Sequence, residues 1–120
     1  MFINFTNHIS TEWSTAQMAA ARAYGEIIDI PFPAVLSDAS ANDINAIADE
    51  YVDRIMQTNP KAVMCQGEFT LTFAVFSKLK SRGITVVAAC SERKKVEHVE
   101  NGATHKTIVF EFKQFREYCS

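Results

Sequence analysis

Short apolar runs alternate with longer amphipathic segments along most of this chain. The apolar runs lie at 2–5, 26–30, 62–65 and 84–89. The last two are short, unbroken and rich in strand-forming residues, which is typical of parallel strands buried on both faces. We therefore predict a strand at each run and helices in the segments between them.

Two helices with clear boundaries are predicted between these strands. Ser14 and Gln17 form a potential capping box for the first helix, which ends before Gly25. The second helix has apolar residues at the spacing i, i+3, i+4, i+7 and i+8, with Ser40 or Asn42 as its cap. These apolar residues are Ile44, Ile47, Ala48, Tyr51, Val52, Ile55 and Met56, and Pro60 follows as the exit.

A third helix, at about 70–82, is unusually apolar. It ends at Gly83, and its first turns carry apolar side chains on nearly every side: Leu71, Phe73, Ala74, Val75, Phe76 and Leu79. One side can pack against the sheet, so the remaining sides need another cover. A second subunit is the simplest cover, and we predict a homodimer.

The pattern after residue 93 changes to that of a β-hairpin. Asn101 and Gly102 are a strong signal for a two-residue turn, which would place His98 opposite His105. In the return strand Ile108, Phe110 and Phe112 fall on one face. The predicted fold class is therefore α/β, with helices covering a mostly parallel sheet and an antiparallel hairpin at the C-terminal end.

The composition fits one domain over residues 1–120 and limits its partners. The chain has 120 residues, 48% of them hydrophobic, and a formal net charge of −2, so we expect no DNA binding through overall charge. The chain does not begin with a basic region followed by a long apolar stretch, so no signal peptide is predicted. No apolar run approaches the length of a membrane span, so no transmembrane helix is predicted. Cys65, Cys90 and Cys119 lack metal-site spacing, which suits reduced thiols in a cytoplasmic protein.

Polar residues follow three of the predicted strands. Asn7, His8 and Ser10 lie in the turn after the first strand, residues 66–70 read Gln-Gly-Glu-Phe-Thr, and residues 90–93 read Cys-Ser-Glu-Arg. In open α/β sheets, ligands bind beyond the carboxyl ends of the strands. We therefore expect the three clusters to meet along one edge and to form a pocket for an anionic nucleotide.

Each cluster also has a structural interpretation. His8 is either a proton shuttle near neutral pH or a turn residue that caps a backbone group. Gly67 would let a phosphate approach the amides of a helix start, and Glu68 is either an acid–base group there or a favourable charge in the first turn. Arg93 suits bidentate phosphate binding, whereas a surface pair with Glu92 would contribute little.

Other residues narrow the chemistry. Trp13 either stacks on a base or packs against a helix. Cys90 is interpreted as structural, because the chain lacks the C-x₅-R spacing of a phosphatase loop. No carboxylate or thiol completes a metal shell around His98 and His105, so no metal site is predicted. Neither the dinucleotide-binding nor the Walker-type glycine pattern is present.

These clusters resemble a known family. The chain resembles a small stand-alone group of CRISPR-associated proteins in three places: Thr6-Asn7-His8 with Trp13, the segment 66–70 and the segment 88–93. That group is related to the CARF domains of type III systems, and some of its members are ring nucleases. The resemblance covers nearly the whole chain. It implies a Rossmann-like, CARF-like three-layer sandwich that forms a homodimer and binds a cyclic oligoadenylate, most simply cyclic tetra-adenylate, across the two-fold axis.

The resemblance also implies an activity. Ring nucleases cleave without a metal or other cofactor: a 2′-hydroxyl of the substrate attacks the adjacent phosphorus and leaves a 2′,3′-cyclic phosphate. In this chain the expected catalytic residues are His8, Glu68 and Arg93. The expected binding residues are Asn7, Ser10, Trp13, Gln66, Gly67, Phe69, Thr70, Cys90, Ser91 and Glu92. A non-catalytic sponge or sensor for the same messenger, and an unrelated nucleotide-binding α/β protein, are the alternatives.

Overall fold

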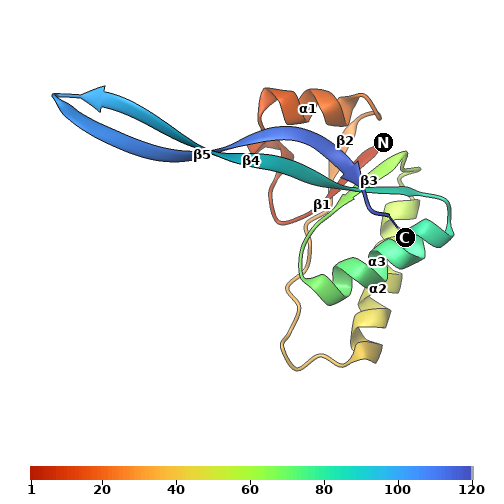
Figure 1. Ribbon diagram of the computed structural model, residues 1–120. Coiled ribbons are helices and arrows are strands. Elements are labelled where there is room, and N and C mark those ends of the chain that lie inside the picture. Colours follow the sequence, from red (N-terminus) through yellow and green to blue (C-terminus); the bar gives the residue numbers. More distant parts are fainter. Residues whose placement is uncertain (120) are drawn as a thin grey trace.

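A five-stranded sheet with helices on both faces forms the body of the protein, and a long hairpin extends away from it (Figure 1). The computed structural model describes residues 1–119. The strands are β1 (Phe2–Phe5), β2 (Ile27–Asp29), β3 (Ala62–Cys65), β4 (Thr85–Glu100) and β5 (Ala103–Glu117). The helices are α1 (Thr15–Arg22), α2 (Ala41–Met56), α3 (Phe69–Ser81) and a short 3₁₀ turn, η1 (Ser10–Glu12).

The strand order in the sheet is β2-β1-β3-β4-β5. Strand β1 runs parallel to β2 and β3, β3 runs parallel to β4, and only the β4–β5 pair is antiparallel. This confirms the predicted α/β class with a C-terminal antiparallel hairpin. After β2 the chain crosses back over β1 to form β3, so the direction of winding reverses between β1 and β3.

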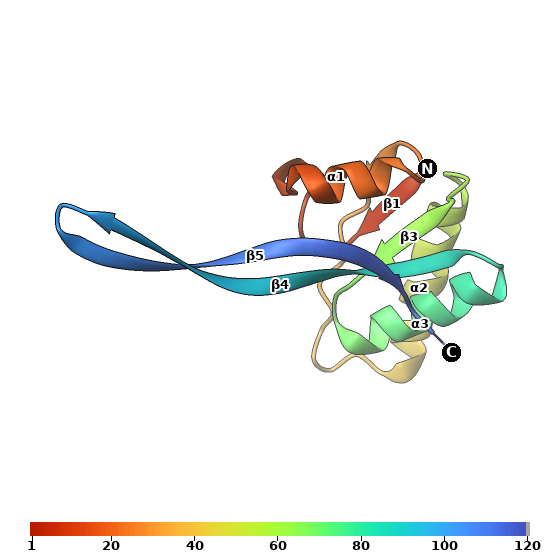
Figure 2. The same ribbon diagram turned by 45° about the horizontal axis from the view of Figure 1, so that its top comes forward.

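The two faces of the sheet have separate apolar cores. Ile3 and Phe5 of β1 face α2 and α3, in a cluster that includes Val52 and Leu71. Phe2 faces the α1 side with Met64, Val87 and the half-buried Trp13. Figures 1 and 2 show α1 on one side of the sheet and α2 with α3 on the other, which gives the predicted three layers. Complete burial of such side chains contributes about 1.5–3 kcal/mol each to folding.

The helices begin close to the predicted residues because their caps are local. The Ser40 side chain accepts a hydrogen bond from the Asp43 amide, and the Asp43 side chain accepts one from the Ser40 amide, which is a complete capping box. The Ser14 side chain likewise accepts from the Gln17 amide at the start of α1. Gly25 follows α1 with φ +144°, a backbone angle that favours glycine.

The hairpin turn and its register agree with the prediction, but the end of the fourth strand does not. Asn101 and Gly102 make the turn, and His98 pairs with His105. Strand β4 does not end near residue 89: it runs without interruption from Thr85 to Glu100. Its polar residues continue the strand because β5 pairs with them along their whole length.

The outer part of this hairpin, residues 91–112, is named the arm here. All of its residues are exposed except the half-buried Phe112, and Figure 1 shows it leaving the body as an isolated ribbon. A β-bulge lies at its root, where Cys90 pairs with Gln114 but Ser91 pairs with Phe112. The extra residue in β5, Lys113, thus shifts the alternation of side chains between arm and body.

No helix within residues 1–119 has both the length and the apolar character that crossing a membrane requires.

Candidate functional site

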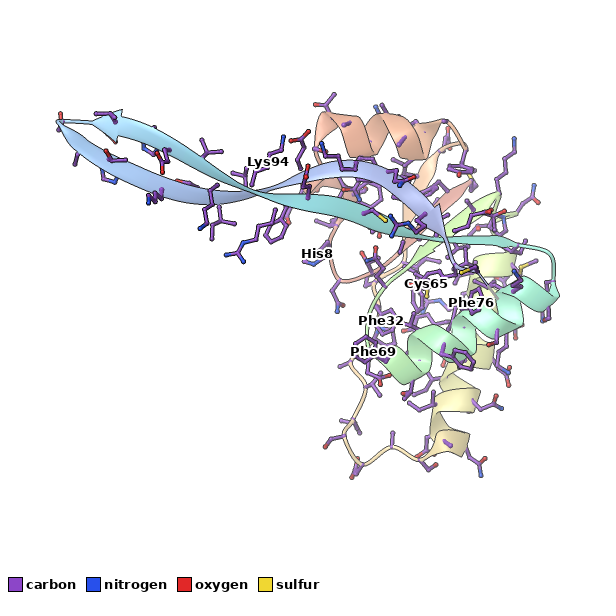
Figure 3. All side chains as sticks on the ribbon, viewed as in Figure 1. His8, Phe32, Cys65, Phe69, Phe76 and Lys94 are labelled. Atoms are coloured by element: carbon purple, nitrogen blue, oxygen red, sulfur yellow. The ribbon has the colours of Figure 1, made fainter. Side chains whose placement is uncertain are left out.

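A network of three buried polar side chains and the exposed Asp29 fixes the loop after β1. The amide of Asn4, which is 1% exposed, donates to the Asp29 carboxylate and to the His8 carbonyl oxygen, both at 2.7 Å. The Thr6 hydroxyl donates to the Asn4 side-chain oxygen at 2.7 Å, and the Ser10 hydroxyl donates to Asp29 at 2.8 Å. The loop backbone is therefore held in place while the His8 side chain stays exposed (Figure 3).

This loop forms one wall of a cavity of about 590 Å³. The cavity lies at the carboxyl ends of β1 and β3 and beside the root of the arm, on the α1 side of the sheet. Its lining residues are Thr6, Asn7, His8, Glu12, Trp13, Ser14, Gln17, Met64, Gln66, Gly67, Ala89, Ser91, Phe110 and Phe112. Because the winding of the sheet reverses between β1 and β3, this is the topological switch point where α/β proteins place their ligands.

The predicted site residues divide into two groups by position. Those that line the cavity are Asn7, His8, Trp13, Gln66, Gly67 and Ser91, which come from all three predicted clusters. Those outside its lining are Ser10, Glu68, Phe69, Thr70, Cys90, Glu92 and Arg93. The three clusters thus converge as expected, but each contributes only some of its residues.

Gln66 and Gly67 link the end of β3 to its neighbours. The Gln66 side-chain oxygen accepts a hydrogen bond from the Ala89 amide at 2.8 Å, which ties β3 to β4 at the cavity floor. A Cβ atom at Gly67 would lie 2.6 Å from the ring of Phe32. The structure therefore gives a packing reason for this glycine, in place of the expected approach of a phosphate to its backbone.

Glu68 caps its own helix. Its carboxylate accepts hydrogen bonds from the Thr70 and Leu71 amides, each at 2.9 Å, and from the Thr70 hydroxyl. These bonds, with the Leu71 amide as the largest contributor, hold the pKa of the Glu68 carboxyl below its ordinary value. The helix amides expected to hold a phosphate are thus occupied by a carboxylate. This corresponds to the structural interpretation of Glu68 and also accounts for Thr70.

Aromatic rings of the core pack behind and beside Trp13 and Phe112, two residues that line the cavity. Trp13 meets Phe2 edge to face, with ring centroids 6.2 Å apart, and lies 6.4 Å from Phe115. Phe115 in turn meets Phe112 edge to face at 5.0 Å. Trp13 therefore packs in the core, as its structural interpretation requires, while part of it remains on the cavity surface.

The cluster at 90–93 lies inside a strand, so its side chains point alternately to opposite faces. Ser91 lines the cavity, and Arg93 shares its face one step further along the arm. Cys90 and Glu92 belong to the other face, which explains why they are absent from the cavity. The expectation that four consecutive residues point into one pocket is wrong, because it assumed a loop here.

Two groups of residues have no part in the cavity. Burial raises the pKa of the Cys65 thiol to about 12, so this thiol stays protonated. At the end of the arm the rings of His98 and His105 stack at 5.3 Å. Within residues 1–119 no group of histidine, cysteine and carboxylate side chains is arranged to hold a metal ion.

Several lining residues were missed in the sequence. Phe110 and Phe112 were assigned only to the hairpin, although they reach the cavity, and Glu12 and Gln17 were not singled out as site residues. Asn4 and Asp29 hold the loop without lining the cavity. A polar residue in the middle of an otherwise apolar strand was the available signal for Asn4, since such a residue must find a buried partner.

The fold and the cavity define a small α/β protein with a candidate ligand site at the switch point of its sheet. Over residues 1–116 the chain matches the family described as Uncharacterized protein MJ1673 family, and it belongs to that family. The matched range includes all of the helices and all of the sheet except the last residue of β5. A comparison with curated proteins finds no match.

Proposed function

We propose that this protein binds cyclic tetra-adenylate and cleaves it without a metal, and so lowers the messenger of type III CRISPR signalling. The observation that carries the proposal is the convergence of Asn7, His8, Gln66 and Ser91, from three separate segments, on one cavity at the switch point. The resemblance of these same segments to ring nucleases gives the substrate and the reaction. The cavity has the size of a typical small-molecule site, which suits part of a cyclic tetranucleotide shared between two copies.

The proposed step is an in-line transesterification. The 2′-oxygen of one nucleotide attacks the neighbouring phosphorus, the bond from phosphorus to the 5′-oxygen breaks, and a 2′,3′-cyclic phosphate forms. His8 takes the proton of the 2′-hydroxyl, and the departing 5′-oxygen takes a proton from solvent water, so that a 5′-hydroxyl forms; His8 then returns its proton to the solvent. The Ser91 hydroxyl and the Asn7 amide donate hydrogen bonds to the phosphate oxygens as negative charge develops on them.

One observation favours the alternative of a non-catalytic sponge or sensor. Among residues 1–119 no hydrogen bond orients the His8 imidazole, although the His8 backbone is held by Asn4 and Thr6. A general base is ordinarily oriented by a further group, so an unoriented imidazole is better suited to binding than to proton transfer. In the enzymatic proposal this orientation comes from the bound substrate.

Incubation of the purified protein with labelled cyclic tetra-adenylate in EDTA tests the proposal. We expect linear products that end in a 2′,3′-cyclic phosphate. The variant His8→Ala should bind with unchanged affinity and cleave about a hundredfold more slowly in single turnover. His105→Ala, which removes an exposed histidine at the far end of the arm, is the matched control and should cleave at the wild-type rate.

The outcomes separate the candidate functions. A gel shift without products would replace the enzyme with the sponge or sensor. The absence of any binding would reject both. A His8→Ala variant that cleaves at the wild-type rate would remove His8 from catalysis and leave positioning of the substrate as the main source of the rate.

A further inference from the structure

The two faces of the arm differ in their relation to the cavity. Directly paired residues of an antiparallel hairpin share a face, and successive pairs alternate. Ser91 with Phe112, Arg93 with Phe110, and Lys95 with Ile108 therefore belong to one face. Since Ser91, Phe110 and Phe112 line the cavity, we name these six residues the pocket-side face of the arm.

The charges of the two faces also differ. On the opposite face Lys94 forms an ion pair with Glu111, and at the bulge Lys113 pairs with Glu92 at 3.2 Å. On the pocket-side face neither Arg93 nor Lys95 has a carboxylate partner within residues 1–119. The surface that leads out of the cavity thus carries two uncompensated positive charges, and an anionic ligand would supply their counter-charge.

An exposed aromatic ring of the cavity lining lies beside these cations. Phe110 is 72% exposed and pairs directly with Arg93 across the hairpin. Arg93 and Lys95 are two residues apart on one strand, a spacing of about 7 Å. A row of cations beside an exposed ring is the arrangement by which proteins hold single-stranded nucleic acid, because the phosphates pair with the cations and a base stacks on the ring.

We propose that the pocket-side face of the arm extends the ligand site from Phe110, in the cavity lining, outward to Arg93 and Lys95, and that it holds further nucleotides of an oligoadenylate there. In this arrangement an adenine stacks on Phe110 while the flanking phosphates pair with Arg93 and Lys95. Arg93 is then a binding residue for the outer part of the ligand and has no contact with the reacting phosphate. The inference rests on the proposed function, because the ligand class is taken from it.

Binding of linear oligoadenylates tests the inference. Fluorescence anisotropy with labelled di-adenylate and hexa-adenylate should show that the wild-type protein prefers the longer chain. Phe110→Ala should weaken hexa-adenylate binding about tenfold, since stacking on an aromatic ring contributes a factor of this order per base. Di-adenylate binding should fall by a smaller factor, because Phe110 is one of many residues that line the cavity. Val109→Ala, one residue away on the opposite face, is the control and should bind both like the wild type.

The charged residues give a second measurement. Arg93→Ala should weaken hexa-adenylate binding more than about tenfold and lower the salt dependence of the affinity by about one phosphate contact. Lys94→Ala, whose lysine already pairs with Glu111 on the opposite face, should leave that salt dependence unchanged. These exposed positions carry little of the core, and circular dichroism would check that each variant is folded.

The failures of the two proposals are distinguishable. If the wild-type protein binds neither cyclic tetra-adenylate nor hexa-adenylate, the proposed function fails. If it binds both, and Phe110→Ala and Arg93→Ala bind like the wild type, only the role of the arm fails. If Phe110→Ala converts a dimer to a monomer in light scattering, the pocket-side face is a contact between two copies, and the nucleotide extension is overturned.

Discussion

At position 67 the lack of a side chain is a packing requirement. Phe32 is 5% exposed, its ring packs against Phe5 with centroids 4.8 Å apart and tilted planes, and it lies where a Cβ of residue 67 would be. The backbone of Gly67 is not in the left-handed region, so an alanine would meet no backbone strain. The glycine thus lets the loop after β3 lie directly on an aromatic ring of the core.

We therefore expect Gly67→Ala to lower the free energy of unfolding by about 1–3 kcal/mol, the usual range for an overpacked core position. Urea denaturation measures this change. The same substitution in a Phe32→Leu background should be less costly, because the smaller side chain can yield. Full stability of Gly67→Ala combined with weaker nucleotide binding would instead restore the interpretation of this glycine as a point of phosphate approach.

The differences between the sequence analysis and the structure at these residues share one physical cause. Gly67, Glu68 and Ser10 were placed near the ligand because their types suit phosphate chemistry and their positions follow strands. Gly67 does line the cavity, but with a packing role that was not predicted, and Glu68 and Ser10 lie outside the lining. Their hydrogen bonds and contacts, to Phe32, to the α3 amides and to Asp29, depend on tertiary or cap geometry that spacing alone does not contain. His8 and Asn7 were placed correctly, since the position after a buried parallel strand already determines their edge of the sheet.

At the scale of the helix, the carboxylate of Glu68 is the cap of α3. Its depressed pKa means that the folded protein favours the ionised form. This contribution to stability is fully present above the carboxyl's unfolded pKa, near 4.5, and is lost as the pH falls through the lower pKa of the folded state. Glu68→Gln should therefore be less stable than the wild type at pH 7.

The pH dependence identifies the cause. The stability difference between wild type and Glu68→Gln, from thermal unfolding at a series of pH values, should shrink as the pH is lowered below about 4.5 and be unchanged above pH 6 or so. A difference that stays constant down to low pH would contradict the capping explanation. Loss of cleavage in a fully folded Glu68→Gln protein would return Glu68 to the acid–base role.

The elements of the body were predictable because their signals are local or periodic. Ser40 caps α2, Pro60 follows it, and Asn101 with Gly102 closes the hairpin where expected. The continuation of β4 through Arg93 was not predictable from apolar content, because an exposed hairpin strand has no buried face to give an apolar pattern. The bulge at Lys113 likewise has no signal in residue type.

For the whole molecule, the homodimer stays a prediction, and we expect α3 to make its contact. Phe76 is covered by Tyr118, with ring centroids 5.3 Å apart, so part of the apolar surface of this helix is satisfied within the chain. Phe69 and Phe73, one helical turn apart, remain 90% and 69% exposed. Exposed aromatic pairs of this kind mark contacts with other proteins, and α3 begins at the same sheet edge as the cavity.

We expect a homodimer at micromolar concentration in light scattering, and we expect Phe73→Glu to convert it to a monomer that is still folded. An unpaired charge buried in a closely packed contact costs several kcal/mol, which is enough to dissociate a dimer of modest affinity. Asn45→Glu, on the exposed face of α2, is the control and should remain dimeric. A wild-type monomer at this concentration would contradict the α3 contact.

The bulge at the root of the arm governs how the hairpin can change in length. Beyond it, removal of one residue from one strand alone would reverse the side of the residues further out on that strand. Removal of Glu92, for example, would carry Arg93 away from Phe110, which lines the cavity. Removing matched pairs from the tip, two from each strand, would shorten the ribbon and leave Ser91, Arg93, Phe110 and Phe112 in place. The length of the arm can therefore change while the residues at its root keep their positions, whereas the register at the root cannot change without moving them.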